Sequence, residues 1–160
     1  MAGIVGRVFR VVGPVVELEG VTSLRMLDMV EVGPQHLIGE VVRLKDDRAH
    51  VQVYEDTTSV KAGDEVYSQG LALYVELGPG LLGTIYDGIQ RPLEVIRQDE
   101  GFYIGRGVHV KPLDRARRWH FTPAVQPGAA VRPGQVIGEV QEAPLVRHKI
   151  LVPPEAQGPV

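Results

Sequence analysis

Short apolar runs, interrupted every few residues by glycine or proline, recur along the whole chain. Glycine (19 residues) and proline (12) together approach a fifth of the sequence, and they stand between the apolar runs as turn residues do. Within Ala49–Tyr54, Val51 and Val53 alternate with polar or aromatic neighbours, the period of a strand buried on one face. The pattern predicts a mainly β fold without long helices.

The first 72 residues contain the densest series of predicted strands. These are Val5–Val12, Val15–Leu18 as its continuation after Gly13–Pro14, Met26–Val32 and Leu37–Leu44 around a Gly33–Pro34 turn, and Ala49–Tyr54 after a reversal at Asp46–Asp47. Five or six strands in about 75 residues bury their apolar faces most easily when the sheet closes on itself. We therefore predict a small closed β-barrel over residues 1–72.

The pattern changes after Leu77, where Gly78-Pro79-Gly80 interrupts the strands. Pro92 suits the first turn of a helix, because its missing N–H has no partner to lose there. In residues 73–110 we expect three short elements: a helical turn at Leu82–Asp87, a second one at Pro92–Gln98, and a strand at Val108–Val110. Beyond them, Thr122–Val140 (TPAVQPGAAVRPGQVIGEV) predicts a second, hairpin-rich β module within residues 111–160.

Composition limits the function classes. Of the 160 residues, 44% are hydrophobic and 23% charged, a balance typical of soluble globular proteins, and no apolar run approaches the ~20 residues of a membrane span. No export signal is recognisable, and the absence of cysteine suits a cytosolic protein. The net charge of -3 argues against a nucleic-acid partner, and the basic cluster Arg115, Arg117 and Arg118 is too short to change that.

The glycine-rich stretch Gly78–Gly83 (GPGLLG) has two interpretations. Consecutive backbone N–H groups can hold a phosphate, but the Lys and Ser/Thr of G-x-x-x-x-G-K-[ST] are missing here and in the rest of the 160 residues. A hinge is therefore favoured. Gly105–Gly107 is expected to be a bulge or a turn.

Other candidate chemistry also has a simpler explanation. The carboxylate pairs Asp46–Asp47 and Glu55–Asp56 would point to opposite faces of a strand, so we interpret both as solvated loop charges. The five histidines show no metal-ligand spacing, so no zinc site is expected; they are His36, His50, His109, His120 and His148. Trp119, with His120 and Phe121, could stack on a ring, but packing in the core of the second module is favoured. We assign no catalytic, cofactor-binding or metal-binding residue.

The longest recognisable string is Leu73–Ile96 (LYVELGPGLLGTIYDGIQRPLEVI). With three others, Gly39–Leu44 (GEVVRL), Val51–Thr57 (VQVYEDT) and His148–Pro154 (HKILVPP), it resembles the catalytic A subunit of the V/A-type rotary ATPases over nearly the whole chain. Thr122–Val140 also resembles, loosely, the barrel-sandwich of biotinyl and lipoyl carriers, with Lys149 as the candidate for modification. Lys149 lacks the flanking residues of a carrier.

The family resemblance implies a division of roles. Residues 1–72 would be the N-terminal barrel that closes an alternating ring with B subunits (A3B3), and the string YEDT would be one of its structural loops. Residues 73–110 would connect to the nucleotide-binding domain. Residues 111–160 would be most of the bulge insertion near the peripheral stalk, incomplete in this chain.

The resemblance also implies that ATP and magnesium serve the full-length subunit, which couples ATP hydrolysis or synthesis to proton or sodium transport. The phosphate-binding loop would lie beyond Val160, so these 160 residues are expected to bind no cofactor. A cytoplasmic protein, attached to the membrane only through its complex, is expected. The alternative is a free-standing β-barrel adaptor or carrier module, and a downstream G-x-x-x-x-G-K-[ST] would decide between them.

Overall fold

The computed structural model describes residues 3–160 and is mainly β, as predicted. The chain divides into two compact units. The first consists of Met1–Val75 with Ile96–His109, and the second of Glu76–Val95 with Val110–Val160. Within residues 3–160, no helix has the length and apolar character needed to cross a membrane.

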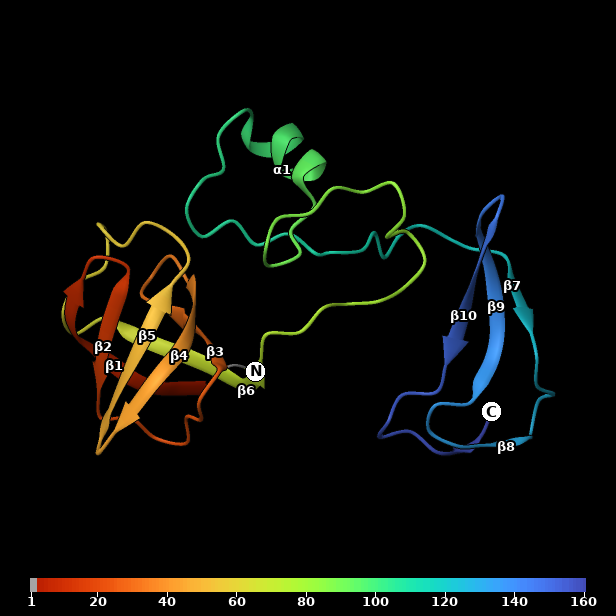
Figure 1. Ribbon diagram of the computed structural model, residues 1–160, viewed down its shortest axis with the longest axis horizontal. Helices are drawn as coiled ribbons and strands as arrows, with labels where there is room; N and C mark the ends of the chain where they lie inside the picture. The colour runs from red at the N-terminus through yellow and green to blue at the C-terminus, as the bar shows by residue number, and fades with distance from the viewer. Residues whose placement is uncertain (1–2) are drawn as a thin grey trace. The chain divides into compact units, whose positions relative to one another are not determined.

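The first unit contains a closed barrel of six strands, which confirms the predicted architecture (Figure 1). The strands are β1 (Gly3–Val12), β2 (Val15–Glu19), β3 (Asp28–Val32), β4 (Leu37–Lys45), β5 (Arg48–Val53) and β6 (Glu65–Ala72). Around the barrel they follow the order β1-β2-β5-β4-β3-β6, and β6 pairs back onto β1. All neighbouring strands are antiparallel. The sheet therefore has no free edge.

Alternation along the strands produces the barrel core. In β3 the residues alternate between buried and half-buried positions, and Val51 and Val53 of β5 are buried while Gln52 is exposed, as the sequence predicts. Twelve buried residues form one cluster: Val5, Val8, Val16, Leu18, Val30, Val32, Leu37, Val41, Ala49, Val51, Val53 and Val66. Most are β-branched valines, which pack well on a pleated surface.

One strand prediction was wrong in its direction. Val15–Leu18 does not continue the first strand, because the chain reverses at Gly13–Pro14 and Val15 pairs with Val12. Gly13 has φ 57°, a backbone conformation that glycine adopts without the steric cost of a Cβ. The two apolar runs therefore form a hairpin. The turns at Gly33–Pro34 and Asp46–Asp47 lie where they were predicted.

The region after the barrel contains one of the two predicted helical turns. Helix α1 (Leu93–Glu100) begins directly after Pro92, close to the predicted Pro92–Gln98. The expected helical turn at Leu82–Asp87 was wrong. Tyr86 instead forms an isolated bridge with Pro92, and the Leu93 N–H donates to the Ile85 carbonyl, so this segment pairs with the chain that follows it.

The expected strand at Val108–Val110 is also absent from the described residues. Within the first unit the Gly107 N–H donates to a side-chain oxygen of Glu55 (2.7 Å), and His109 Nε2 lies 3.0 Å from the His36 carbonyl oxygen. A closed barrel offers no unpaired strand edge, so this segment is held by isolated contacts rather than by a ladder.

The second unit contains the predicted hairpin-rich module. Its strands are β7 (Phe121–Pro123), β8 (Ala130–Val131), β9 (Val136–Ala143), β10 (Val146–Leu151) and β11 (Gly158–Pro159). They form a three-stranded sheet, β10-β9-β7 (Figure 1), and a two-stranded one, β11-β8. The buried hydrophobic residues of this module are Val131, Val140 and Val152. Its core is therefore much smaller than that of the barrel.

Candidate functional site

The glycine-rich loop at Gly78–Gly83 holds an anion that belongs to the chain itself. The backbone N–H groups of Gly80 and Leu82 both donate to Oε1 of Glu142, at 2.7 and 3.1 Å. Glu142 lies on β9, 62 residues beyond Gly80. The backbone geometry considered for a phosphate is thus used for a carboxylate, and sequence inspection did not single out Glu142.

The Glu142 carboxylate is almost fully enclosed. Its side chain is 3% exposed, and its second oxygen, Oε2, lies 3.1 Å from Nδ1 of His148. Burial raises the pKa of Glu142, but the hydrogen bonds from Leu82 and Gly80, together with His148, outweigh that effect and leave the pKa below its ordinary value. The group is therefore held as a buried, ionised and hydrogen-bonded carboxylate.

A second carboxylate organises the turn before α1. Asp87 accepts hydrogen bonds from the backbone N–H groups of Ile89 and Arg91, and its Oδ2 accepts one from Arg91 Nε at 2.8 Å. Burial raises the pKa of Asp87, and the Arg91 and Ile89 hydrogen bonds lower it by more, so the net shift is downward. Nearby, the Glu76 N–H donates to Gln90 Oε1 (2.6 Å), and Gln90 Nε2 donates to the Glu76 carbonyl (2.8 Å).

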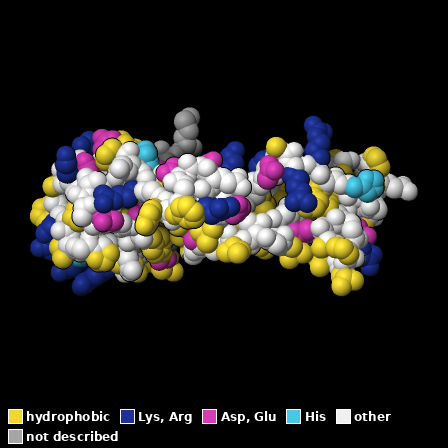
Figure 2. All heavy atoms as spheres, turned by 90° about the horizontal axis from the view of Figure 1, so that it is seen from above, with side chains coloured by type: hydrophobic (Ala, Val, Ile, Leu, Met, Phe, Trp, Pro, Cys, Tyr) yellow, Lys and Arg dark blue, Asp and Glu magenta, His cyan; other side chains and the backbone are white. Residues whose placement is uncertain are grey.

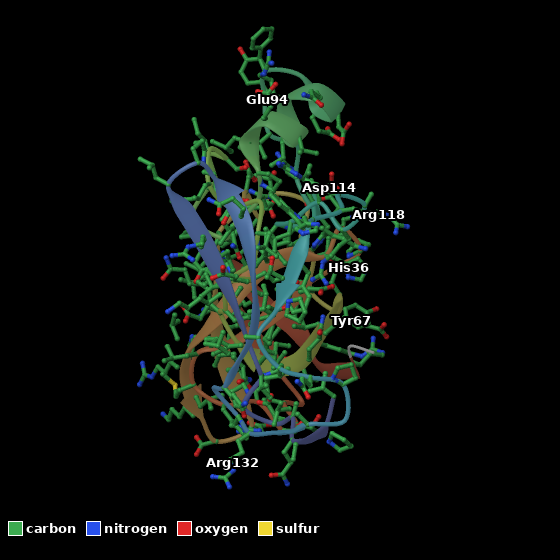
Figure 3. The ribbon with its side chains drawn as sticks, turned by 90° about the vertical axis from the view of Figure 1, so that its right-hand side faces the viewer. His36, Tyr67, Glu94, Asp114, Arg118 and Arg132 are labelled. Atoms are coloured by element: carbon green, nitrogen blue, oxygen red, sulfur yellow. The ribbon has the colours of Figure 1, made fainter. Side chains whose placement is uncertain are left out.

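A shallow depression in the second unit joins aromatic and charged side chains. The Arg117 guanidinium lies 4.0 Å from the ring centre of Trp119, and Arg115 forms an ion pair with Glu76 at 2.7 Å. Its lining consists of Glu76, Leu77, Pro79, Leu113, Asp114, Arg115, Arg117 and Trp119. Arg118 is exposed and extends away from the ribbon (Figure 3).

The prediction that the Trp119 cluster packs in the module core was wrong. Trp119 is half-buried, His120 is exposed, and Phe121 is 44% exposed. The aromatic ring instead lies near the glycine-rich loop, since a Cβ added at Gly80 would come within 3.6 Å of Trp119 Cζ2. Trp119 therefore packs beside the loop that Glu142 holds.

In the first unit, Glu55 and Asp56 are not simply solvated charges. Glu55 accepts the Gly107 N–H at 2.7 Å, while Asp56 accepts the Thr58 N–H at 2.7 Å and lies 3.4 Å from Arg106. The pair fastens residues 106–107 within this unit. Asp46 and Asp47 are exposed in a turn, as predicted for solvated loop charges. Arg106–Gly107 forms a turn, one of the two structures expected for Gly105–Gly107.

The outer barrel surface carries a charge network that the sequence did not reveal. Glu17 lies between Arg48 (2.8 Å) and Arg10 (3.2 Å), and the Arg48 guanidinium also lies 3.9 Å from the ring centre of Phe9. The hydrogen bond from Arg48 is the main cause of the lowered pKa of Glu17. Glu17 and Arg48 are 31 residues apart, and only the β2–β5 pairing brings them together.

His36, His109 and His148 each make a different polar contact. His36 Nδ1 is 2.9 Å from a carboxylate oxygen of Glu31, and the centre of its ring lies 5.2 Å from that of the Tyr67 ring. His148 contacts Glu142 and His109 contacts the His36 carbonyl. Among residues 3–160, no group of three or more His, Cys, Asp or Glu side chains is arranged to hold a metal ion.

The position of Lys149 does not favour the carrier alternative. Lys149 lies within β10, opposite Glu139 of β9, whereas the tip of this hairpin is formed by Pro144 and Leu145. A carrier lysine would be presented at the tip. We assign no catalytic role to any residue in the described part of the chain. The absence of catalytic residues stays a prediction.

Comparison with known proteins agrees with the architecture. Residues 8–70 match the family model of the ATP synthase alpha/beta family, beta-barrel domain. Residues 110–160 match that of the ATPsynthase alpha/beta subunit barrel-sandwich domain. The two matched regions correspond to the closed barrel and to the hairpin-rich module of the second unit.

Similar proteins include the A subunit of the A-type ATP synthase of Hyperthermus butylicus, which is 54% identical over 96% of this chain and 26% of its own length. Its counterpart in Staphylothermus marinus is 48% identical over 99% of this chain and 27% of its own length. That of Pyrococcus abyssi is 50% identical over 97% of this chain and 15% of its own length. This chain spans about a quarter of the length of the first two. With both domain matches and identity along nearly its whole length, the chain belongs to the ATP synthase alpha/beta family and corresponds to the N-terminal region of the A subunit of an A-type ATP synthase.

Proposed function

We propose that these residues serve the assembly of a proton- or sodium-translocating rotary ATP synthase or ATPase, as the N-terminal region of its catalytic A subunit. The observation that carries this proposal is the closed six-stranded barrel in a chain that, over 96% of its own residues, is 54% identical to the A subunit of an A-type ATP synthase. The complex would lie on the cytoplasmic side of the membrane, and this region would reach the membrane only through other subunits.

The barrel is assigned to ring closure with B subunits. Because its strands leave no free edge, contacts with neighbouring subunits must use side chains rather than strand addition. Its surface provides apolar ones: Ile4 is 54% exposed, Val12 57% and Leu71 51%. Hydrophobic side chains are visible at the surface in Figure 2. Such residues support an interface between the barrel and neighbouring subunits.

The second unit is assigned to contact with the peripheral stalk. Support comes from its separate barrel-sandwich match and from exposed apolar side chains at the tip of the β9–β10 hairpin, where Leu145 is 97% exposed. The role is in assembly rather than in chemistry, and no nucleic-acid partner is proposed.

Nucleotide chemistry is assigned to other parts of the longer subunit, where ATP and magnesium would bind. These 160 residues contain no G-x-x-x-x-G-K-[ST], the loop whose N–H groups and lysine hold the phosphates. Large apolar side chains in residues 73–104 support a covering domain, since Leu77 is 77% exposed, Phe102 91% and Tyr103 88%.

We predict that the isolated chain neither binds nor hydrolyses Mg-ATP. Isothermal titration calorimetry should show no heat of binding, and a phosphate-release assay should show no turnover. The matched positive control is a longer A subunit that carries the phosphate-binding loop. Micromolar binding by the 160-residue chain would contradict the assignment.

Deletions in the longer subunit separate the two assembly roles. Removing residues 111–160 should weaken attachment of the stalk while leaving the ring with B subunits intact, because the barrel is untouched. Removing residues 1–72 should prevent the ring. Native mass spectrometry of the purified complexes reads out both. Normal stalk attachment after the first deletion, or normal rings after the second, would overturn the corresponding role.

A further inference from the structure

The two N–H groups of the glycine-rich loop converge on a single atom. Gly80 and Leu82 both donate to Oε1 of Glu142, at 2.7 and 3.1 Å. Convergent backbone donors of this kind bind anions in many proteins, and a bond to an ionised acceptor is about twice as strong as a neutral one. The arrangement therefore has the chemistry of an anion-binding loop.

Burial distinguishes this carboxylate from its neighbour on the same strand. The Glu142 side chain is 3% exposed, whereas that of Glu139 on β9 is 36% exposed and faces Arg147 at 3.4 Å. A charge withdrawn from water is tolerated only where hydrogen bonds replace its hydration. For Glu142 the replacements are the two loop N–H groups and His148, 3.1 Å away.

Two side chains, Leu113 and Trp119, lie beside the glycine-rich loop. A Cβ at Gly78 would come within 2.9 Å of Leu113 Cδ1, and one at Gly80 within 3.6 Å of Trp119 Cζ2. The hydrogen bond from the Thr84 hydroxyl to the Gly80 carbonyl, at 3.2 Å, joins residues only four positions apart. The bond to Glu142 is a long-range tie, joining residues 62 positions apart.

We propose that residues 80–82 form a carboxylate-binding site whose ligand is built into the chain, and that Glu142 acts as a latch that holds the glycine-rich loop on β9. Two donors on one oxygen and His148 beside the other match the two ends of a carboxylate. This inference is independent of the proposed role in a rotary ATPase.

The test uses the 160-residue chain with Glu142→Ala, and Glu139→Ala as the matched control. The substitution removes CH2–COO⁻, which acetate replaces almost atom for atom. Amide exchange measured by NMR should become about tenfold faster at Gly80 and Leu82, as expected for the loss of one charge-assisted bond. Sodium acetate should slow it again, while sodium chloride at equal ionic strength should not. Glu139→Ala should leave the exchange rates of the Gly80 and Leu82 amides unchanged.

Fluorescence gives an independent measure, because Trp119 is the single tryptophan of the chain and packs near Gly80. Its emission should shift to longer wavelength in Glu142→Ala and return with acetate. If that variant does not fold, Glu142→Gln retains the size and loses the charge, and should still accelerate exchange at both amides. Unchanged amide exchange at Gly80 and Leu82 in the folded variants would show that Glu142 does not hold the loop. Faster exchange in Glu142→Ala that acetate slows no more than chloride does would show that residues 80–82 are not a carboxylate-binding site.

Discussion

At the scale of single residues, side-chain carboxylates accept hydrogen bonds from backbone N–H groups in segments that have little secondary structure. Residues 73–110 contain one helix, yet Asp87 satisfies two backbone N–H groups and Glu142 satisfies two more. These side chains give the four backbone N–H groups the acceptors that neighbouring strands provide in the barrel. Long irregular segments can be ordered in this way.

Glycine at position 39 is predicted to be required for barrel packing. A Cβ there would lie 2.7 Å from Val51 Cγ1 and 3.0 Å from the Gln52 carbonyl oxygen, whereas one at Gly3 would meet nothing within 4 Å. Gly39→Ala should therefore destabilise the chain by about 1–3 kcal/mol, the range for overpacking a core. Urea denaturation followed by circular dichroism measures the loss. Gly3→Ala is the control, and equal stabilities of the two variants would contradict the prediction.

Asp87 is predicted to make the second unit sensitive to acid. Its pKa is lower in the folded chain than its ordinary value of 3.8, so its stabilising contribution is complete above that value. The contribution is lost as the pH falls through the folded pKa, because the unfolded state then binds the proton more readily. Trp119 fluorescence, which reports on this unit, should show unfolding on acidification.

Asp87→Asn should make that acid transition shallower, because a neutral amide has no proton to gain. Some acid dependence should remain, since the pKa of Glu142 is lowered as well. An identical pH profile for the variant and the parent chain would show that Asp87 does not contribute.

At the scale of elements, alternation was the reliable signal and local helical spacing was not. The strands around Val51 and Val53 were predicted from their period, and Pro92 correctly marked the start of α1. Leu82–Asp87 has apolar residues at helical spacing but bonds instead to the segment that follows it, through Tyr86 and Ile85. A short helix gains little from its own hydrogen bonds, so such pairing readily replaces it.

The barrel is predicted to fold without the rest of the chain. Its six strands end at Ala72, and its twelve core residues all lie before Tyr67. Residues 1–72 alone should therefore show one cooperative β-type transition on heating, by circular dichroism. The full chain is the control. A broad, non-cooperative transition would show that the barrel needs the segments that follow.

At the scale of the whole molecule, the two units differ in the size of their cores. The barrel has twelve buried hydrophobic residues in one cluster, while β7–β11 bury Val131, Val140 and Val152. Each buried valine or leucine contributes about 1.5–3 kcal/mol, so opening the barrel costs far more. Residues 111–160 should accordingly exchange amide hydrogens faster than Val5–Tyr54 in mass-spectrometric measurements. Equal protection of the two regions would contradict this.

The sequence was sufficient for the mainly β class, for the closed barrel and for the family. Each depends on patterns that neighbouring residues carry, such as alternation in Ala49–Tyr54 or the string Leu73–Ile96. The sequence left open which polar groups meet. Glu55 with Gly107, and Glu142 with Gly80, are 52 and 62 residues apart. A hydrogen bond forms only within about 3 Å and in the right direction, so such pairs exist only after the strands have paired and the loops have packed.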